Sequence, residues 1–332
     1  MNATSTLLRS AVALVLGGAC AAAQQYGDVV VFGDSLSDDG NLFALTGQPP
    51  PPYWMGRFSN GHVWAEQLAN WLELDPAAIT DLAMGGATTQ DVRDAQVVPY
   101  LAAHGGVVPS DALCTLWAGG NDLLNLLGDP DADPAQGIGD AIDHLGGSIA
   151  LLLAGGARHI MVVNMPDLSL VPRVAGSGSP ELIGQVLALT AAFNDAQAEL
   201  VAWFEINFGV DLIELDAFAI TDEIVAAPKS FGLKNATDPA FDGVTIARKP
   251  DDCLFWDAIH PTRAGHNVIA GRAVAALGMV WCDLDGSGGV DGADEKLLKQ
   301  SYGPCSGGCR ADLNADGVVD KGDLEILQSV RH

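Results

Sequence analysis

One stretch decides the fold of this chain: Phe32-Gly33-Asp34-Ser35-Leu36-Ser37-Asp38-Asp39-Gly40-Asn41, which follows the β-branched run Val29-Val30-Val31. The apolar run predicts a buried strand, and the Gly- and Asp-rich residues after it predict a tight turn. Such a turn presents Ser35 at the carboxyl edge of a parallel sheet, where open α/β folds place their functional sites. An ordinary strand-ending turn has the same composition, so other segments must decide whether Ser35 is functional.

Short apolar runs alternate with longer helical stretches between residue 27 and about residue 278. The runs predict strands at 29–32, 79–83, 113–118, 160–164 and 212–215. The helical stretches lie at about 61–74, 135–154, 180–208, 216–227 and 262–277. This alternation predicts an α/β fold with a parallel sheet covered by helices on both faces. The long Pro-, Gly- and Asp-rich segments 47–60 and 228–256 are expected to overhang the site and to contact substrate.

The acidic balance of the chain excludes one class of partner. Sixteen Lys and Arg residues against 42 Asp and Glu residues give a formal net charge of −26. A field of this sign repels phosphate backbones and anionic lipid surfaces, so nucleic acid is not expected as a partner.

Residues 1–23 predict a secretory signal peptide. Arg9 supplies the positive end, an apolar stretch follows, and Ala21-Ala22-Ala23 form a small-residue cleavage site. The apolar stretch is too short to span a bilayer, so no transmembrane segment is expected and the protein is predicted to be secreted. Cys20 leaves lipoprotein anchoring at the cell surface as an alternative. Gly17 disfavours this alternative, because a large apolar residue is wanted at that position.

Five cysteines remain after the signal segment, and an exported protein permits disulfides. Because five is an odd number, at least one thiol is expected to stay free or to pair elsewhere. Cys114 lies in an apolar run and is expected to be a reduced core residue. Two residues among Cys282, Cys305 and Cys309 can form a disulfide within the C-terminal segment. The sequence does not decide which of these residues and Cys253 pair.

A serine hydroxyl needs a base and a group that orients the base before it becomes a nucleophile. The stretch Asp257-Ala258-Ile259-His260-Pro261 offers both partners. Its spacing allows Asp257 to accept from one imidazole nitrogen while the other nitrogen faces Ser35. The sequence therefore predicts Ser35, His260 and Asp257 as nucleophile, base and orienting group.

Acyl transfer also needs donors aimed at the developing oxyanion. Gly86 follows the second predicted strand, and a glycine there lets its backbone N–H approach substrate. Asn121 follows the third predicted strand and can add a side-chain amide, and the Ser35 backbone N–H is the third donor. Each position alone has the composition of a turn. Together they fall at successive strand ends on one sheet edge, which predicts an oxyanion hole.

These blocks resemble the signature of the SGNH, or GDSL-type, esterases and lipases over about residues 27–278. The four signature positions are matched by Ser35, Gly86, Asn121 and His260. Further similar blocks are Gly56-Arg57-Phe58-Ser59-Asn60-Gly61, Val163-Asn164-Met165-Pro166-Asp167 and Phe255-Trp256-Asp257-Ala258-Ile259-His260-Pro261-Thr262, which look like the phospholipase/lecithinase/hemolysin-type branch. The resemblance implies a flavodoxin-like α/β/α sandwich and ester hydrolysis through an acyl-serine, with no cofactor for catalysis. It implies the same roles for Ser35, Asp257, His260, Gly86 and Asn121.

A repeat occupies residues 282–332, with Asp283 and Asp312 at equivalent positions 29 residues apart. Each copy places oxygen ligands at alternating positions of a twelve-residue loop, with glycine sixth, which is the pattern of a calcium loop. The expected ligands of the first loop are Asp283, Asp285, Ser287, the Gly289 carbonyl, Asp291 and Asp294. Those of the second are Asp312, Asn314, Asp316, the Val318 carbonyl, Asp320 and Asp323. Two calcium ions are therefore expected, with the first loop binding more weakly because Ser287 replaces a carboxylate.

One short amphipathic helix follows each loop, at 295–302 and 324–330, and the twelfth ligand is Asp rather than the Glu of calcium sensors. These features resemble type I dockerin modules. The resemblance implies a small all-α, EF-hand-like module that docks onto a cohesin-like protein partner. A pair of metal-bound loops that only stabilises the fold is the alternative.

Three functions follow from these observations. The first is a secreted serine esterase or lipase that acts on a small ester, a lipid or an acylated carbohydrate. The second narrows this to a carbohydrate acetylesterase working on polysaccharide. The third is a non-catalytic surface binding or scaffold protein. The intact set of nucleophile, base and oxyanion donors favours the enzyme.

Overall fold

The computed structural model describes residues 26–305, 309–314 and 316–331 of the 332-residue chain. The signal segment predicted at residues 1–23 lies outside these residues. Within the described part of the chain, no helix has both the length and the apolar character that crossing a membrane requires.

Five parallel strands form the central sheet, in the order β2-β1-β3-β4-β5. They are β1 (Asp28–Gly33), β2 (Ile79–Asp81), β3 (Ala112–Trp117), β4 (His159–Val163) and β5 (Ile213–Leu215). All five strands predicted from the apolar runs are present, with ends shifted by no more than two residues. The order is that of the flavodoxin-like fold, so the predicted fold class of this part is confirmed.

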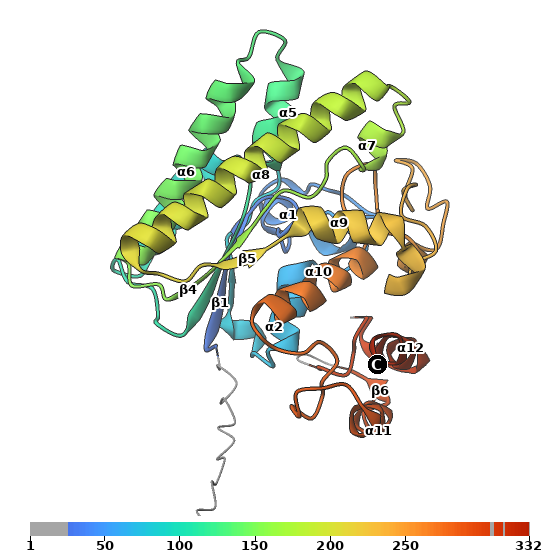
Figure 1. Ribbon diagram of the computed structural model, residues 1–332. Coiled ribbons are helices and arrows are strands. Elements are labelled where there is room, and N and C mark those ends of the chain that lie inside the picture. The colour runs from blue at the N-terminus through green and yellow to red at the C-terminus, as the bar shows by residue number, and fades with distance from the viewer. Residues whose placement is uncertain (1–25, 306–308, 315, 332) are drawn as a thin grey trace, which may run out of the picture.

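Helices cover both faces of the sheet (Figure 1). The predicted helices are present as α2 (Trp64–Trp71), α6 (Pro134–Ala154), α8 (Pro180–Phe208), α9 (Ala217–Ala226) and α10 (Arg263–Ala276). Ser179 caps α8 by accepting from the Leu182 N–H, with Pro180 at the first helical position, as the sequence predicts. The sequence did not predict α1 (Asn41–Thr46), α3 (Thr89–Asp91), the π-helix η3 (Val92–Val97), α4 (Val98–Ala103), α5 (Gly120–Gly128) and α7 (Pro172–Ala175). Short 3₁₀ turns are η1 (Trp54–Gly56), η2 (Pro76–Ala78), η4 (Pro228–Phe231) and η5 (Pro250–Asp252).

Alternate residues of the strands point to opposite faces and divide the core in two. Val30 and Phe32 of β1 pack with α4, α6 and the C-terminal half of α8. Val29 and Val31 pack with α2, α9, α10 and the N-terminal half of α8. The central strands are buried on both faces, which explains their nearly continuous apolar sequence.

The C-terminal repeat folds as α11 (Gly292–Gln300) and α12 (Lys321–Val330), joined by the two-residue strands β6 (Gly303–Pro304) and β7 (Val318–Val319). The antiparallel pairing of β6 with β7 corrects the all-α prediction for this segment. The pairing arises because both loop ends run extended side by side and satisfy each other's backbone groups. A disulfide joins Cys305 to Cys309, whereas Cys114, Cys253 and Cys282 are free and buried.

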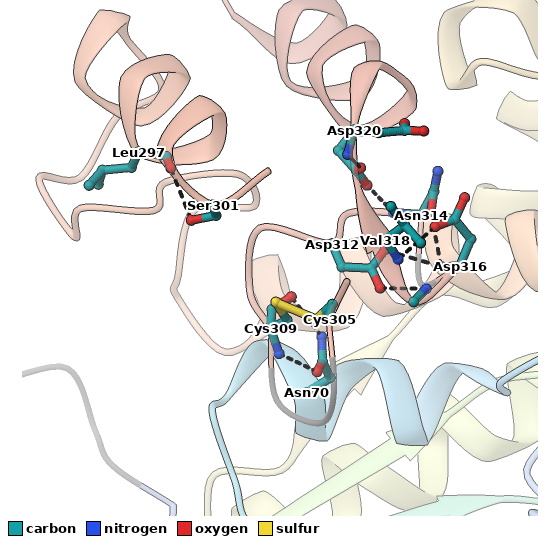
Figure 2. The surroundings of a disulfide bond; sticks show 12 residues. Asn70, Leu297, Ser301, Cys305, Cys309, Asp312, Asn314, Asp316, Val318 and Asp320 are labelled. Carbon is teal, nitrogen blue, oxygen red and sulfur yellow. Dashed lines mark hydrogen bonds between the residues drawn. A yellow bond between two sulfur atoms is a disulfide. The ribbon is translucent and has the colours of Figure 1, made fainter. Parts of the chain in front are cut away.

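The C-terminal segment packs against α2 rather than standing apart. Asn70 exchanges two hydrogen bonds with the backbone of Cys309, at 2.7 and 3.2 Å (Figure 2). Arg310 lies over the Trp71 ring and donates to the Trp71 carbonyl, and Trp281 packs on the same ring at 4.6 Å. Apolar residues of α11 and α12 join the core that α2 and α10 form. The two parts therefore share one continuous apolar core.

Candidate active site

Ser35 follows β1 in a turn that several buried hydrogen bonds hold. The N–H groups of Ser37 and Asp38 donate to the Asp34 carbonyl, both at 3.0 Å. The Gln96 side chain bonds both the N–H and the carbonyl of Gly33, at 2.9 and 2.8 Å. A Cβ at Gly33 would lie 2.7 Å from the Trp117 carbonyl oxygen, so β3 approaches β1 here as only glycine permits. The turn thus presents Ser35 at the carboxyl edge of the sheet, as predicted.

His260 and Asp257 lie beside Ser35, as their spacing predicts. The His260 Nε2 atom is 2.9 Å from Ser35 Oγ, and Nδ1 is 2.8 Å from Asp257 Oδ2. The three side chains therefore form one hydrogen-bonded chain. This geometry allows the imidazole to accept the hydroxyl proton while Asp257 holds its other nitrogen.

The loop from Asp257 to His260 is rigid for local reasons. Asp257 Oδ1 accepts from the N–H groups of Ile259 and His260, at 2.8 and 2.7 Å. Burial alone would raise the pKa of Asp257. The charge of His260 and these hydrogen bonds outweigh burial and bring the pKa of Asp257 to about 2. Thr262 then caps α10 by accepting from the Gly265 N–H, so the helix begins directly after the loop.

The predicted oxyanion positions gather around Ser35. Gly86 has φ of 85°, and a Cβ there would meet nothing within 4 Å, so its backbone faces open space. Gly86 and Asn121 line the same cavity as Ser35 and His260. The Asn121 amide donates to the Ala87 carbonyl at 2.9 Å and makes only a 3.4 Å contact with Asp34. The Asn121 amide thus has two acceptors, and the hydrogen that makes the longer bond to Asp34 is the candidate donor to the oxyanion.

A cavity of about 540 Å³ opens at Ser35 and is lined by residues of helices α5, α7, α8, α9 and α10. Its apolar lining includes Leu124, Leu127, Val171, Val174, Val186, Ile220, Ile224 and Ile269. Of the two long segments expected to contact substrate, 47–60 contributes Phe58 and 228–256 contributes Leu254 and Phe255. Trp54 packs instead on His62, and Trp256 is buried. The site therefore suits a molecule whose polar reacting group lies at Ser35 and His260 and whose apolar chain lies along the apolar lining.

Sequence reasoning did not identify Tyr53. Its hydroxyl donates to Asp257 Oδ2 at 2.7 Å. Tyr53 lies in segment 47–60, so the composition of this segment indicates the neighbourhood of the site. No motif spacing links it to Asp257, because 204 residues separate them.

Asp34 is a buried carboxyl group beside the site. Burial raises its pKa to about 6. The Leu36 N–H and the charge of His260 act in the opposite direction, and the charges of Asp122 and Asp38 act in the same direction as burial. The folded protein therefore disfavours the ionised form of Asp34.

The two C-terminal loops repeat the same hydrogen bonds. Asp283 accepts from the N–H groups of Ser287 and Gly288, and Asp312 accepts from those of Asp316 and Gly317. In the same way, Asp294 accepts from Asp291, and Asp323 accepts from Asp320. The repeat in sequence is thus a repeat in structure.

The predicted ligands come together to different degrees. Asp283, Asp285 and Asp294 each offer an oxygen within 4.8 Å of the other two. Ser287 Oγ donates to the Gly289 carbonyl, so these two expected ligands bond each other. Asp291 and Asp320 cap α11 and α12. In the second loop, the Asp316 N–H donates to the Asn314 side chain, and the Val318 N–H donates to the Asp316 carboxylate.

The chain is similar to several known proteins. The sequence matches the family described as GDSL-like Lipase/Acylhydrolase over residues 29–273. It is 28% identical to the thermolabile hemolysin of Vibrio parahaemolyticus, over 74% of this chain and 62% of the hemolysin. It is 31% identical to the phosphatidylcholine-sterol acyltransferase of Aeromonas hydrophila, over 75% of this chain and 89% of that protein. Among solved structures, the acetylxylan esterase Axe2 of Geobacillus stearothermophilus aligns at 14% identity with a TM-score of 0.47, over 78% of this chain and 98% of that chain.

Replacing Asp34 by Asn should change how stability depends on pH. The folded pKa of Asp34 lies above its ordinary value of 3.8, so ionisation destabilises the native state fully above pH 6 and not below about pH 4. The free energy of unfolding of Asp34→Asn should exceed that of the parent at pH 8 by on the order of 3 kcal/mol. The difference should vanish as the pH falls from 6 to 4. Urea unfolding at each pH measures it, with exposed Asp143→Asn as control. Parallel curves for parent and Asp34→Asn would contradict the prediction.

Proposed function

Because the chain belongs to the GDSL-like lipase and acylhydrolase family, a family of ester hydrolases, we propose that it hydrolyses carboxylic esters with long acyl chains through an acyl-Ser35 intermediate. The observation that carries the proposal is the hydrogen-bonded chain of Ser35, His260 and Asp257 at the mouth of an apolar cavity.

The proposed reaction has two stages. His260 Nε2 removes the proton of Ser35 Oγ as this oxygen attacks the ester carbonyl carbon. The N–H groups of Ser35 and Gly86 and the amide of Asn121 donate to the oxyanion of the tetrahedral intermediate. The carbon–oxygen bond to the alcohol then breaks, and the leaving oxygen takes the proton from His260. In the second stage His260 removes a proton from water, which attacks the acyl carbon and releases the acid as Ser35 regains its proton.

The cavity supports a long acyl chain over an acetyl group. Each methylene group that moves from water into an apolar site contributes about 0.8 kcal/mol, so binding should strengthen as the chain fills the cavity. An acetyl group reaches only the polar mouth beside Ser35 and His260 and leaves the volume of about 540 Å³ unused. For this reason the carbohydrate acetylesterase is the second candidate and the lipase-like esterase the first.

We also propose that each C-terminal loop binds one calcium ion. The donors available are the oxygens that calcium prefers, and three carboxylates lie within 4.8 Å of one another in the first loop. Unneutralised carboxylates this close repel each other, so the set fits a cation. Asp283, Asp285 and Asp294 would hold the ion of the first loop, and Asp312, Asn314, Asp316 and Asp323 that of the second.

Export and docking complete the proposal. The sequence of residues 1–23 supports secretion, and one relative is named secreted effector protein SseJ of Salmonella typhimurium. Docking onto a cohesin-like partner rests on the loop pattern alone. The packing of the C-terminal segment on α2 supports a stabilising role for the loops as well.

The proposed function makes three predictions, of which the first concerns chain length and the nucleophile. On p-nitrophenyl esters from acetyl to palmitoyl, kcat/KM should rise with chain length, and Ser35→Ala should lower kcat by about 10⁴-fold or more. The exposed control Ser177→Ala should match the parent. A maximum at acetyl would favour acetylated polysaccharide instead. Activity retained in Ser35→Ala would refute the nucleophile, and inactivity on every ester would favour a binding protein.

The second prediction places the acyl chain in the cavity. Ala217 lies on α9 and lines the cavity, so Ala217→Phe should fill part of it. We expect kcat/KM to fall about tenfold or more for palmitoyl esters and to change less than twofold for acetyl esters, because only the long chain loses buried methylene groups. Ala226→Phe, at an exposed position of the same helix, is the matched control. An equal loss for both esters would place the chain elsewhere.

The third prediction concerns calcium. Calorimetric titration of the full chain after treatment with a chelator should show two sites, of which the tighter disappears in Asp312→Ala and the weaker in Asp283→Ala. Both loops offer the same number of carboxylates, because Asp285 of the first loop stands where the second has Asn314. The second loop should be tighter because its third position is the carboxylate of Asp316, whereas the Ser287 hydroxyl in the first loop is bonded to the Gly289 carbonyl. At calcium concentrations about 100-fold above Kd, each site should stabilise the chain by about 2.7 kcal/mol, measured as a rise in Tm. Loss of the tighter site in Asp283→Ala would reverse the assignment.

A further inference from the structure

Tyr53 reaches the orienting carboxylate from a distant part of the chain. Its hydroxyl lies 2.7 Å from Asp257 Oδ2, the oxygen that also faces His260 Nδ1. Burial and the charge of Asp257 raise the pKa of Tyr53, so the phenol is protonated and donates this hydrogen bond. The series Tyr53–Asp257–His260–Ser35 is therefore continuous.

The Tyr53 ring has a fixed position. It makes edge-to-face contacts with Phe58, Phe241 and Trp256, at centroid distances of 6.2, 5.8 and 6.0 Å. Phe241 and Trp256 also stack on each other at 5.4 Å. Such pairs prefer defined geometries, so the hydroxyl is aimed before substrate arrives.

The two oxygens of Asp257 are held in different ways. Backbone N–H groups of its own loop hold Oδ1, which also lies 3.0 Å from His260 Nδ1. Apart from His260, the partner of Oδ2 among the described residues is Tyr53. The hydroxyl therefore keeps Oδ2 directed at His260 and disperses part of its negative charge.

We propose that Tyr53 is a positioning residue for the ester hydrolysis, acting through Asp257 on the orientation and basicity of His260. The inference rests on the proposed function. Tyr53 does not line the cavity, so its effect should appear in kcat and in the pH profile and not in KM.

Other charged groups near His260 must be considered in a pH profile. Asp34 lies on the β1 side with a pKa of about 6, and Arg173 lines the cavity from α7. His266 on α10 is buried, and burial lowers its pKa to about 3, so it stays neutral where the enzyme works. All three remain in place when the Tyr53 hydroxyl is removed, so a shift between parent and variant reports the hydroxyl.

The test compares the parent, Tyr53→Phe and Ser35→Ala on a hexanoyl ester from pH 5 to 9. In Tyr53→Phe, kcat should fall about tenfold, the lower end of what one hydrogen bond to a charged group contributes. KM should change less than twofold. Without the hydroxyl, Asp257 carries more negative charge toward His260 and stabilises its protonated form. The acid limb of kcat/KM should therefore move to higher pH by about half a unit.

Phe241→Leu is the matched control, because it disturbs the aromatic packing of Tyr53 and keeps the hydroxyl. Its acid limb should coincide with that of the parent. Labelling of Ser35 by a fluorophosphonate counts folded sites in the parent, Tyr53→Phe and Phe241→Leu, so kcat is expressed per competent molecule in these three. Ser35→Ala cannot be labelled, and its rate is expressed per total protein. A parent-like kcat and pH profile in Tyr53→Phe, with Ser35→Ala inactive, overturns the role of Tyr53 alone. An equal shift of the acid limb of kcat/KM in Phe241→Leu would also overturn the role of the Tyr53 hydroxyl. Activity in Ser35→Ala overturns the proposed function and this inference together.

Discussion

The proposed chemistry depends on one hydrogen bond between distant residues, from Ser35 Oγ to His260 Nε2 across 225 positions of sequence. Ser35 is fixed by β1 at the centre of the sheet, and His260 stands on a loop that ends at α10. The bond can form only if α10 packs on the face of the sheet that places its first turn beside β1. The close packing of α10 on α2 and the shared apolar core satisfy this requirement. Elements far from the chemistry thus decide whether the proton acceptor reaches the hydroxyl.

The two carboxyl groups buried near this bond, Asp257 and Asp34, differ in how well the fold stabilises their ionised forms. Asp257 is compensated by His260 and by two backbone N–H groups, so its charge is stable in the fold and its pKa falls to about 2. Asp34 has less compensation, and its pKa rises to about 6. Two carboxyl groups near one imidazole therefore differ in the pH at which they ionise. Between about pH 2 and pH 6, Asp257 is therefore ionised while Asp34 is largely protonated, and above pH 6 both carboxyl groups carry a charge.

The sequence predicted most of what local pattern determines. The central strands are short, buried and strongly apolar. The start of α8 is indicated by the N-cap residue Ser179 and by Pro180 at the first helical position. The helix α5 was missed because it begins at Gly120-Asn121-Asp122, residues that also suit a turn. The segment from α3 to α4 was missed because Pro99 interrupts it and η3 is a π-helix, whose periodicity differs from the 3.6-residue repeat.

At the site, residues in motifs were predictable and those brought in by packing were not. Ser35, Gly86 and Asn121 follow strands in one parallel sheet, and Asp257 and His260 lie three residues apart, so spacing alone indicated their meeting. Tyr53 and the cavity depend on how loops and helices pack across the sheet. No period or spacing in one sequence records such contacts.

The position of the cavity follows from the same packing that positions His260. Helices α9 and α10 and the N-terminal half of α8 cover the face of the sheet to which Val29 and Val31 point. The α8 helix is long enough to pack with both core layers, with Val186 and Phe193 in one and Val201 and Phe204 in the other. The N-terminal end of α8 contributes Leu182 and Val186 to the lining of the cavity at Ser35, and apolar side chains of α9 and α10 extend this lining. The apolar cavity and the polar centre are therefore two consequences of one arrangement of helices.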